Sequence, residues 1–333
     1  MKVTIVGGGG GVGASTAFNL LLGKHVSPAA RSGSARADPG AQRSLKASAS
    51  RPHGHEIVLI DSRPEMITSH VMDLEQVLEQ SPGSSVRGGD ASDLEDADVV
   101  VLVSGVPLTV GTSRLEYMAQ NALLADELAA ELPVGWGGVL LVVTNPVDPL
   151  VTRLQRRTGL ERSRVLGYTL NDSLRLRTGL AKALGVEPGA VEAWVLGEHG
   201  DASVPLYDRV TVNGERVRPT LEQAAAAEDY LRTWYVTHVA LDSGRSSTWT
   251  SGLGVARMVA GLDGPGELWP ASVVLEGEYG IDGVALTVPV TLGRGGVSEI
   301  HQWELEPDDL AALRASAEVV RAAVAGIDEE GTE

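Results

Sequence analysis

The first 22 residues place five consecutive glycines between a β-branched segment and an apolar segment of helical pattern. Gly7, Gly10 and Gly13 fit G-x-x-G-x-x-G, and Gly8, Gly10 and Gly13 fit G-x-G-x-x-G. Glycines permit a tight turn after a strand and let the backbone approach a pyrophosphate at the N-terminus of the next helix. Strand, turn and helix together predict the first βαβ unit of a dinucleotide-binding sheet.

Strand-like and helical segments alternate through the first half of the chain, which predicts right-handed βαβ units and a parallel sheet. The expected strands are Val3–Val6, Ile57–Ile60, Val99–Val103 and Val139–Val143, and the expected helices are Val12–Leu22, Arg114–Leu132 and Val147–Thr158. The second half instead shows strands at Val191–Leu196 and Val204–Val212, hairpin turns at Asn213-Gly214 and Gly293–Gly296, and helices at Leu221–Ser243 and Pro307–Ala325. We expect an α/β protein with a Rossmann-type doubly wound parallel sheet in residues 1–150 and an α+β substrate domain in residues 151–333.

Residues 24–55 do not share these patterns. They are rich in Ser, Ala, Arg, Pro and Gly, and they hold six Lys and Arg residues but one acidic residue. Such a stretch buries too little apolar surface to order itself, so we expect a disordered insertion between the first helix and the second strand. It is interpreted either as a tolerated surface insertion or as a basic tether for an acidic partner.

An acidic residue is expected at the end of the second strand of such a sheet, about 20 residues beyond the glycines. Asp61 ends Ile57–Ile60 and falls at about that spacing once the insertion is removed. A carboxylate there accepts hydrogen bonds from both ribose hydroxyls and repels a 2′-phosphate. NAD is therefore the expected cofactor rather than NADP, with Arg63 nearby as the one feature that favours NADP.

Composition limits the classes of function. The chain has 333 residues, a net charge of −17 and no cysteine, so thiolate metal sites and a cysteine nucleophile are excluded, and we expect no metal. Such a charge repels nucleic acid and anionic membranes. The chain shows no signal peptide and no apolar run long enough to span a membrane. We expect a soluble cytoplasmic protein.

Oxidation of a 2-hydroxy acid needs a base for the hydroxyl proton and cations for the oxygen and the carboxylate. His199 lies in a glycine-flanked polar run after an apolar strand, and imidazole titrates near neutrality. Asp172 can fix its tautomer, and Arg175, three positions later on the same helix face, can grip a carboxylate. The alternatives are a structural histidine and an ordinary surface ion pair.

Two further segments follow strands at the edge where ligands of open α/β sheets bind. Gly105–Arg114 holds two glycines and can form a mobile lid that carries Arg114, unless Arg114 merely starts a helix. Thr144 and Asn145 end another strand, where the Asn145 amide can donate to substrate or to the nicotinamide ribose.

In their order and spacing these runs resemble the lactate/malate dehydrogenase family, most of all its malate-dehydrogenase-like branch from halophilic archaea. The resemblance covers the chain except residues 24–55. It implies that His199 is the acid/base residue with Asp172 as partner, and that Arg175 binds the carboxylate while Arg114 polarises the carbonyl. It also implies contacts of Asn121 and Asn145 with substrate or cofactor, and a homodimer or homotetramer.

The resemblance places the family's substrate-selecting position at Leu108, where malate enzymes are expected to have arginine and lactate enzymes glutamine. Leucine offers neither charge nor hydrogen bond, so burial of a second substrate carboxylate against it costs several kcal/mol. Ser247 aligns with a second pocket position and leaves room there. Val110 replaces the proline usual before Gly111. The whole-chain resemblance implies malate as the hydroxy acid, whereas Leu108 favours an apolar 2-oxo acid, such as the oxo acid of lactate, over oxaloacetate.

Two functions fit these observations. The first is an NAD-dependent dehydrogenase of a small 2-hydroxy acid, which the complete set of catalytic residues favours. The second is a non-catalytic NAD-binding sensor or assembly protein, which Leu108, Val110 and the insertion favour.

We predict that molar salt stabilises this protein, because an acidic surface with only four lysines suits proteins that stay hydrated in brine. The urea midpoint should rise from low to molar KCl. An unchanged midpoint would instead indicate a merely acidic protein from a GC-rich genome.

Overall fold

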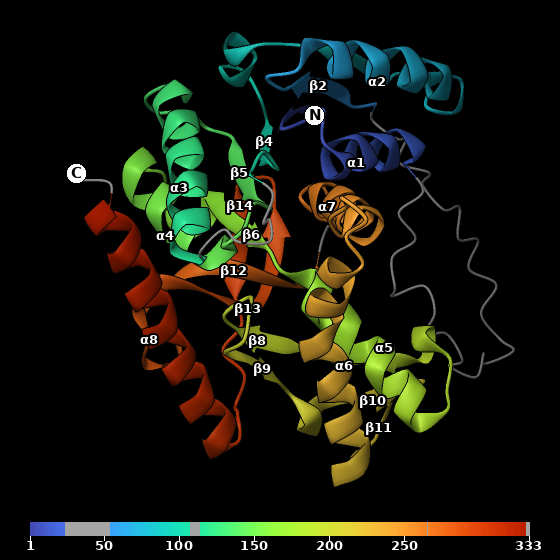
Figure 1. The fold of residues 1–333 in the computed structure, drawn as a ribbon, viewed down its shortest axis with the longest axis vertical. Coiled ribbons are helices and arrows are strands. Elements are labelled where there is room, and N and C mark those ends of the chain that lie inside the picture. Colours follow the sequence, from blue (N-terminus) through green and yellow to red (C-terminus); the bar gives the residue numbers. More distant parts are fainter. Residues whose placement is uncertain (24–53, 107–113, 265, 331–333) are drawn as a thin grey trace, which may run out of the picture.

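The computed structural model describes residues 1–23, 54–106, 114–264 and 266–330. Within these ranges eleven strands form one mixed sheet, and three short strands form a second (Figure 1). The strands are β1 (Lys2–Val6), β2 (Glu56–Ile60), β3 (Ser85–Gly88), β4 (Val99–Leu102), β5 (Val139–Val142), β6 (Val165–Tyr168), β7 (Val191–Glu192), β8 (Val195–Gly197), β9 (Ser203–Pro205), β10 (Thr211–Val212), β11 (Glu215–Arg216), β12 (Leu268–Glu276), β13 (Asp282–Gly293) and β14 (Gly296–Ile300). The α-helices are α1 (Gly11–Leu22), α2 (Pro64–Val77), α3 (Arg114–Glu131), α4 (Val147–Thr158), α5 (Leu170–Leu184), α6 (Leu221–Ala240), α7 (Thr248–Gly261) and α8 (Pro307–Glu330).

The large sheet runs in the order β3-β2-β1-β4-β5-β6-β12-β13-β8-β9, with β14 on β13. The six neighbouring strands β3, β2, β1, β4, β5 and β6 are parallel to one another. Strands β12, β13 and β8 continue the sheet, each antiparallel to its neighbour. The chain runs outward from β1 through β2 to β3 and then crosses back to β4 on the other side of β1. The carboxyl ends of β1 and β4 therefore mark the switch point at which ligands of such sheets bind. The expected doubly wound parallel sheet is confirmed.

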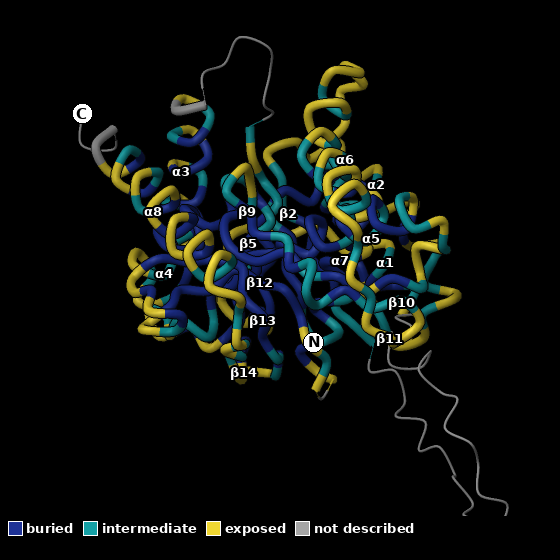
Figure 2. Tube along the Cα trace, turned by 90° about the horizontal axis from the view of Figure 1, so that it is seen from below, coloured by how far each residue is buried: buried dark blue, intermediate teal, exposed yellow. Residues whose placement is uncertain are grey.

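Burial follows the apolar runs of the sequence. All four residues of β4 and of β5 are buried, as expected for parallel strands covered by helices on both faces (Figure 2). Helices α3, α4 and α8 pack against one another, and α1 packs against α2 and α7 (Figure 1). No helix in the described part of the chain is long and apolar enough to cross a membrane.

The second half departs from the expected elements. Val191–Leu196 is not one strand, because the chain changes sheets at Ala193-Trp194, and the Trp194 ring packs edge-on against Trp303 with centroids 5.0 Å apart. Val204–Val212 is likewise divided between β9 and β10. The Asn213-Gly214 turn does form the expected hairpin, with φ of 52° and 81° at its two residues.

Sequence patterns did not assign α2, α7, β3, β6 or β12. Helix α7 is rich in glycine, and a Cβ on its Gly252 would lie 2.2 Å from the Ser15 Oγ atom of α1. Small residues there serve close helix packing, which weakens the apolar periodicity used to recognise a helix. The predicted insertion at 24–55 lies outside the described residues except for Gly54 and His55.

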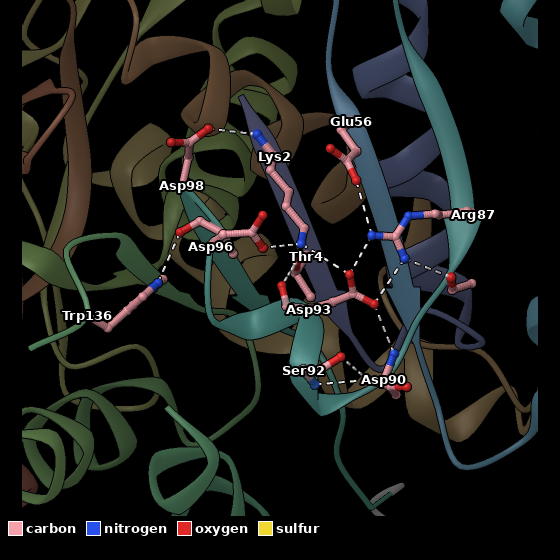
Figure 3. A network of polar contacts seen from close by, with 12 residues as sticks. Lys2, Thr4, Glu56, Arg87, Asp90, Ser92, Asp93, Asp96, Asp98 and Trp136 are labelled. Atoms are coloured by element: carbon pink, nitrogen blue, oxygen red, sulfur yellow. Dashed lines mark hydrogen bonds and ion pairs between the residues drawn. The ribbon is translucent and has the colours of Figure 1, made fainter. Parts of the chain in front are cut away.

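A polar network ties the first strand to the far edge of the parallel sheet (Figure 3). The Lys2 side chain is only 10% exposed, and its ammonium group donates to Asp93 Oδ1 at 3.1 Å and also pairs with Asp96. Arg87 of β3 donates from Nη1 to Asp93 Oδ2 at 3.0 Å and from Nη2 to Glu56 Oε1 at 3.1 Å. Hydrogen bonds from Arg87 outweigh burial and, with those from Lys2, hold the pKa of Asp93 well below its usual range.

We predict that Lys2→Met lowers the free energy of unfolding by about 1 kcal/mol at pH 7, because the aliphatic stem remains while a partly buried ion pair is lost. Since the pKa of Asp93 is lowered by folding, its contribution is present above about pH 4 and disappears as the pH falls toward the folded value. Urea titrations at several pH values should show the difference narrowing below pH ~4. Arg216→Met, at an exposed position, should change little at any pH; an equal loss in both variants would contradict the prediction.

Candidate active site

The glycine turn lies at the switch point and needs glycine for steric reasons. Gly7 has a φ of +96°, and a Cβ there would lie 2.4 Å from the backbone nitrogen of Ser104 after β4. A Cβ on Gly13 would lie 2.6 Å from the Gly7 carbonyl oxygen. Gly10 caps α1 without a side chain, so the first turn of the helix presents its N–H groups at an open N-terminus. This cradle fits a pyrophosphate.

Asp61 follows β2 beside this turn. Its Oδ2 accepts a hydrogen bond from the Gly9 N–H at 3.0 Å, and its Oδ1 accepts from Arg63 Nε at 3.0 Å. Burial raises the pKa of Asp61, but the hydrogen bonds and charge of Arg63 and the bond from Gly9 outweigh it and keep the group ionised. The carboxylate therefore lies where the ribose of a dinucleotide on the glycine turn would need acceptors, and Arg63 is engaged by it.

Asn121 of α3 bridges the segments that follow β4 and β5. Its Nδ2 donates to the Asn145 carbonyl oxygen at 2.8 Å, and its Oδ1 accepts from the Val106 N–H at 2.8 Å. Thr144 Oγ1 donates to the Ser104 carbonyl at 2.6 Å. Asn121 is 1% exposed, so its amide holds these two segments together, whereas the half-buried Asn145 side chain stays open to a ligand.

His199 and Asp172 form the centre of the candidate active site. Asp172 lies in the first turn of α5 and His199 follows β8, and the Nδ1 atom of His199 is 2.5 Å from Asp172 Oδ2. Arg175 Nη1 donates to the other carboxylate oxygen at 3.2 Å. The side chains of His199 and Asp172 are only 14% and 11% exposed. Tertiary structure thus unites the three residues selected from the sequence.

Burial and charge act in opposite directions on this pair. Burial lowers the pKa of His199, but the charge of Asp172 and its hydrogen bond outweigh burial and raise it above the ordinary value. Burial raises the pKa of Asp172, but the charge and hydrogen bond of His199, and then the charge of Arg175, lower it overall. The ion pair is therefore favoured, and the imidazole Nε2 is left as the atom that can exchange a proton.

Trp234 of α6 holds the Arg175 guanidinium. The Arg175 Cζ atom lies 4.3 Å from the centroid of the Trp234 ring, a cation–π contact, and the Trp234 ring stacks on His238. Within the described residues Arg175 donates one hydrogen bond, from Nη1 to Asp172. Its Nε and Nη2 donors remain for a ligand carboxylate.

Ser247 occupies the N-cap position of α7 without a side-chain capping bond and is half-buried. The first turn of α7 contacts both halves of the site. Asn171, next to Asp172, donates from Nδ2 to Ser251 Oγ at 2.9 Å, and a Cβ on Gly11 would lie 3.1 Å from Thr248 Oγ1. Ser247 therefore stands where the glycine turn and α5 approach each other.

Two positions of the expected lid, Leu108 and Val110, lie outside the described residues. Arg114 is the first residue of α3, whose start directly follows the 107–113 segment.

Sequence reasoning assigned no role to three residues that shape this site: Asp148, Arg232 and Trp234. Arg232 donates from Nη1 to the Asp201 carbonyl and to Ser203 Oγ, both at 2.8 Å, and so fixes the loop after His199. Both Arg232 and Trp234 lie more than 30 residues from His199 in an ordinary helical pattern, so no local signal marks them. The one sequence signal that could have pointed to Asp148 was its position two residues after Pro146, next to the run expected to contact a ligand.

Comparison with known proteins agrees with the geometry. Residues 1–167 match a family model described as lactate/malate dehydrogenase, NAD binding domain, and residues 169–330 match the alpha/beta C-terminal domain of the same family. The residues at the glycine turn and at Asp61 fit the cofactor that the first description names.

Individual relatives are similar over most of their length. A malate dehydrogenase of Halobacterium salinarum is 33% identical over 96% of this chain and 97% of its own. An L-lactate dehydrogenase of Lactobacillus delbrueckii subsp. bulgaricus is 36% identical over 80% of this chain and 89% of its own.

Solved structures show the same fold. A minor L-lactate dehydrogenase of Enterococcus mundtii superposes with a TM-score of 0.81 at 27% identity, covering 97% of each chain. A malate dehydrogenase of Salinibacter ruber gives 0.81 at 25%, covering 99% of this chain and 98% of its own. Solved structures of a lactate and of a malate dehydrogenase thus both match nearly the whole chain. The resemblance seen in the sequence is confirmed. The chain belongs to the lactate/malate dehydrogenase family of NAD-dependent 2-hydroxy acid oxidoreductases.

Proposed function

We propose that this protein transfers hydride reversibly between NAD and an L-2-hydroxy acid with an apolar side chain, with His199 as the acid/base residue. The observation that carries the proposal is the buried His199–Asp172 pair, with Arg175 on the same carboxylate. NAD, when bound, supplies the hydride acceptor at its nicotinamide ring. The glycines 7, 10 and 13 and Asp61 would hold it, with Asn145 and Thr144 at the neighbouring strand end.

His199 has the geometry for proton transfer. Because Nδ1 donates to Asp172, the lone pair of neutral imidazole is on Nε2, which can accept the substrate hydroxyl proton during oxidation. In reduction the same atom returns that proton to the carbonyl oxygen. Arg175 would receive the substrate carboxylate on its free Nε and Nη2 donors, and Arg114 would polarise the carbonyl oxygen.

Leu108 supports an apolar substrate side chain such as that of lactate. A second carboxylate, as in malate, would lose its hydration without gaining a donor at this position. Ser247, small and at the N-terminus of α7, supports space for a larger substituent. The relatives do not distinguish the two substrates, because both malate and lactate dehydrogenases are similar to this chain.

A homodimer or homotetramer is also proposed. Helices α1, α6 and α7 carry large apolar side chains that are exposed in the single chain, among them Phe18 at 43%, Val236 at 69% and Trp249 at 68%. Association with another copy of the chain would cover these side chains.

His199→Asn should lower turnover of a 2-oxo acid by about 100- to 10,000-fold, because asparagine cannot exchange the proton, while NADH binding is retained. Stopped-flow oxidation of NADH and NADH fluorescence titration measure the two effects. His301→Asn is the matched control, since His301 contacts Thr291 in β13, away from Asp172. Near-normal turnover in His199→Asn would contradict the proposed role.

Substrate choice can be tested with pyruvate, bulkier 2-oxo acids and oxaloacetate in molar salt. We expect oxaloacetate to be a weak substrate of the unmodified protein and to gain about 10-fold or more in kcat/KM in Leu108→Arg, where a guanidinium pairs with the second carboxylate. Leu108→Met keeps the size without the charge and should show no gain. Strong oxaloacetate turnover by the unmodified protein would contradict the substrate assignment. Bound NADH with no turnover of any acid would favour a sensor.

A further inference from the structure

Asp148 is a second buried carboxylate beside the centre of the candidate active site. It lies in the first turn of α4, three residues after Asn145, and is 1% exposed. Its Oδ2 accepts a hydrogen bond from the backbone N–H of His199 at 2.6 Å. Its Oδ1 accepts from Ser272 Oγ of β12, also at 2.6 Å. Both carboxylate oxygens are thus used inside the protein.

The surroundings hold this carboxylate in one place. Ser272 is fully buried and lies opposite Gly167 of β6 in the sheet register. A Cβ on Gly167 would lie 2.3 Å from Val147 Cγ1 and 2.8 Å from Ser272 Cβ. Glycine at 167 therefore lets the first turn of α4 rest directly on β6 and β12, with Asp148 pointing to the His199 backbone.

His199 is consequently held from two elements. Asp172 of α5 binds the imidazole ring, and Asp148 of α4 binds the backbone nitrogen of the same residue. Asp148 is also three residues after Asn145, which lies in the segment between β5 and α4. One short path of bonds therefore joins the strand end on the cofactor side to the proton-transferring residue.

We propose that Asp148 is a positioning residue for His199: it fixes the backbone of His199 relative to the end of β5, and its charge stabilises the imidazolium form together with Asp172. This inference rests on the proposed function, in which His199 exchanges the substrate proton. Asp148 acts through His199 and does not touch the substrate.

The charges around Asp148 fit this role. His199 and Glu198 reach it from the loop after β8, Asp172 and Arg175 of α5 face His199, and β12 contributes the uncharged Ser272. Burial raises the pKa of Asp148 to about 6, against the hydrogen bonds from His199 and Ser272 that lower it. The group is therefore mainly ionised at neutral pH. Its charge adds to that of Asp172 in raising the pKa of His199 against the effect of burial.

Asp148→Asn separates charge from geometry. The carbonyl oxygen of the introduced amide can still accept from the His199 N–H, and its NH₂ group can donate to Ser272 Oγ, so both contacts keep a partner, the second with its direction reversed, while the negative charge is lost. Reduction of a 2-oxo acid needs imidazolium, and it falls as the pH rises through the pKa of His199. We expect this alkaline limb to move about one pH unit lower and kcat on that limb to fall by up to about 10-fold.

The KM for the 2-oxo acid should change little, because Arg175 is untouched. Asp148→Ala, which also removes the backbone acceptor, should lose more in kcat than Asp148→Asn. Asp229→Asn, at an exposed position on α6, is the matched control and should leave the pH profile unchanged. The measurement is kcat and KM for NADH-dependent reduction of pyruvate, or of the best acid in the panel, from pH 5.5 to 9.5.

An alkaline limb and a kcat that stay unchanged in folded Asp148→Asn would overturn the inference. If that variant does not fold, Ser272→Ala replaces it. Loss of the donor to Oδ1 favours neutral Asp148, so the limb should again move to lower pH, and an unmoved limb overturns the inference. Failure of the proposed function is a separate result, namely turnover retained by His199→Asn.

Discussion

Compensation of buried charge governs the arrangement of this site. Asp172 and Asp148 are withdrawn from water close to the imidazole of His199, and an uncompensated buried carboxylate would cost several kcal/mol. Each has its own donors: the His199 ring and Arg175 of the same helix for Asp172, and the His199 backbone and Ser272 for Asp148. The start of α4, the start of α5, the loop after β8 and β12 are therefore fixed relative to one another, because a shift in any of them would leave a charge without a partner.

The sheet supplies the frame for this compensation. The order β3-β2-β1-β4-β5-β6 brings the carboxyl ends of β1, β2, β4 and β5 to one edge, and β12 then attaches the second half antiparallel to β6. Glycines occur where elements approach closely: Gly7 lies against the backbone of Ser104 at the switch point, and Gly167 lies against the side chain of Val147 where α4 meets β6. The candidate cofactor site and the proposed proton-transfer site are thus built on one continuous sheet.

Much of the fold followed from local pattern. The β-branched runs of β1, β2, β4 and β5 were found to within a residue or two, because strands buried on both faces are nearly uniformly apolar. The glycine turn and Asp61 could be placed because strand, turn and helix are consecutive in the chain. Helix α7 was not predicted, because the glycines that let it pack on α1 weaken its apolar periodicity. Val191–Leu196 was wrongly predicted to be one strand, because a change of sheet leaves no periodic signal in the sequence.

Residue type and local spacing were enough to establish the α/β class and the dinucleotide turn, and to select His199, Asp172 and Arg175 as candidates. Each of these depends on neighbours within one turn or one strand. Folding in three dimensions was needed to show that His199 Nδ1 meets Asp172, that Trp234 supports Arg175, and that Asp148 holds the His199 backbone. These contacts join residues that are 27, 59 and 51 positions apart in the chain. Only the tertiary packing of α4, α5, α6 and β8 brings such residues into contact, and no periodicity of the sequence encodes that proximity.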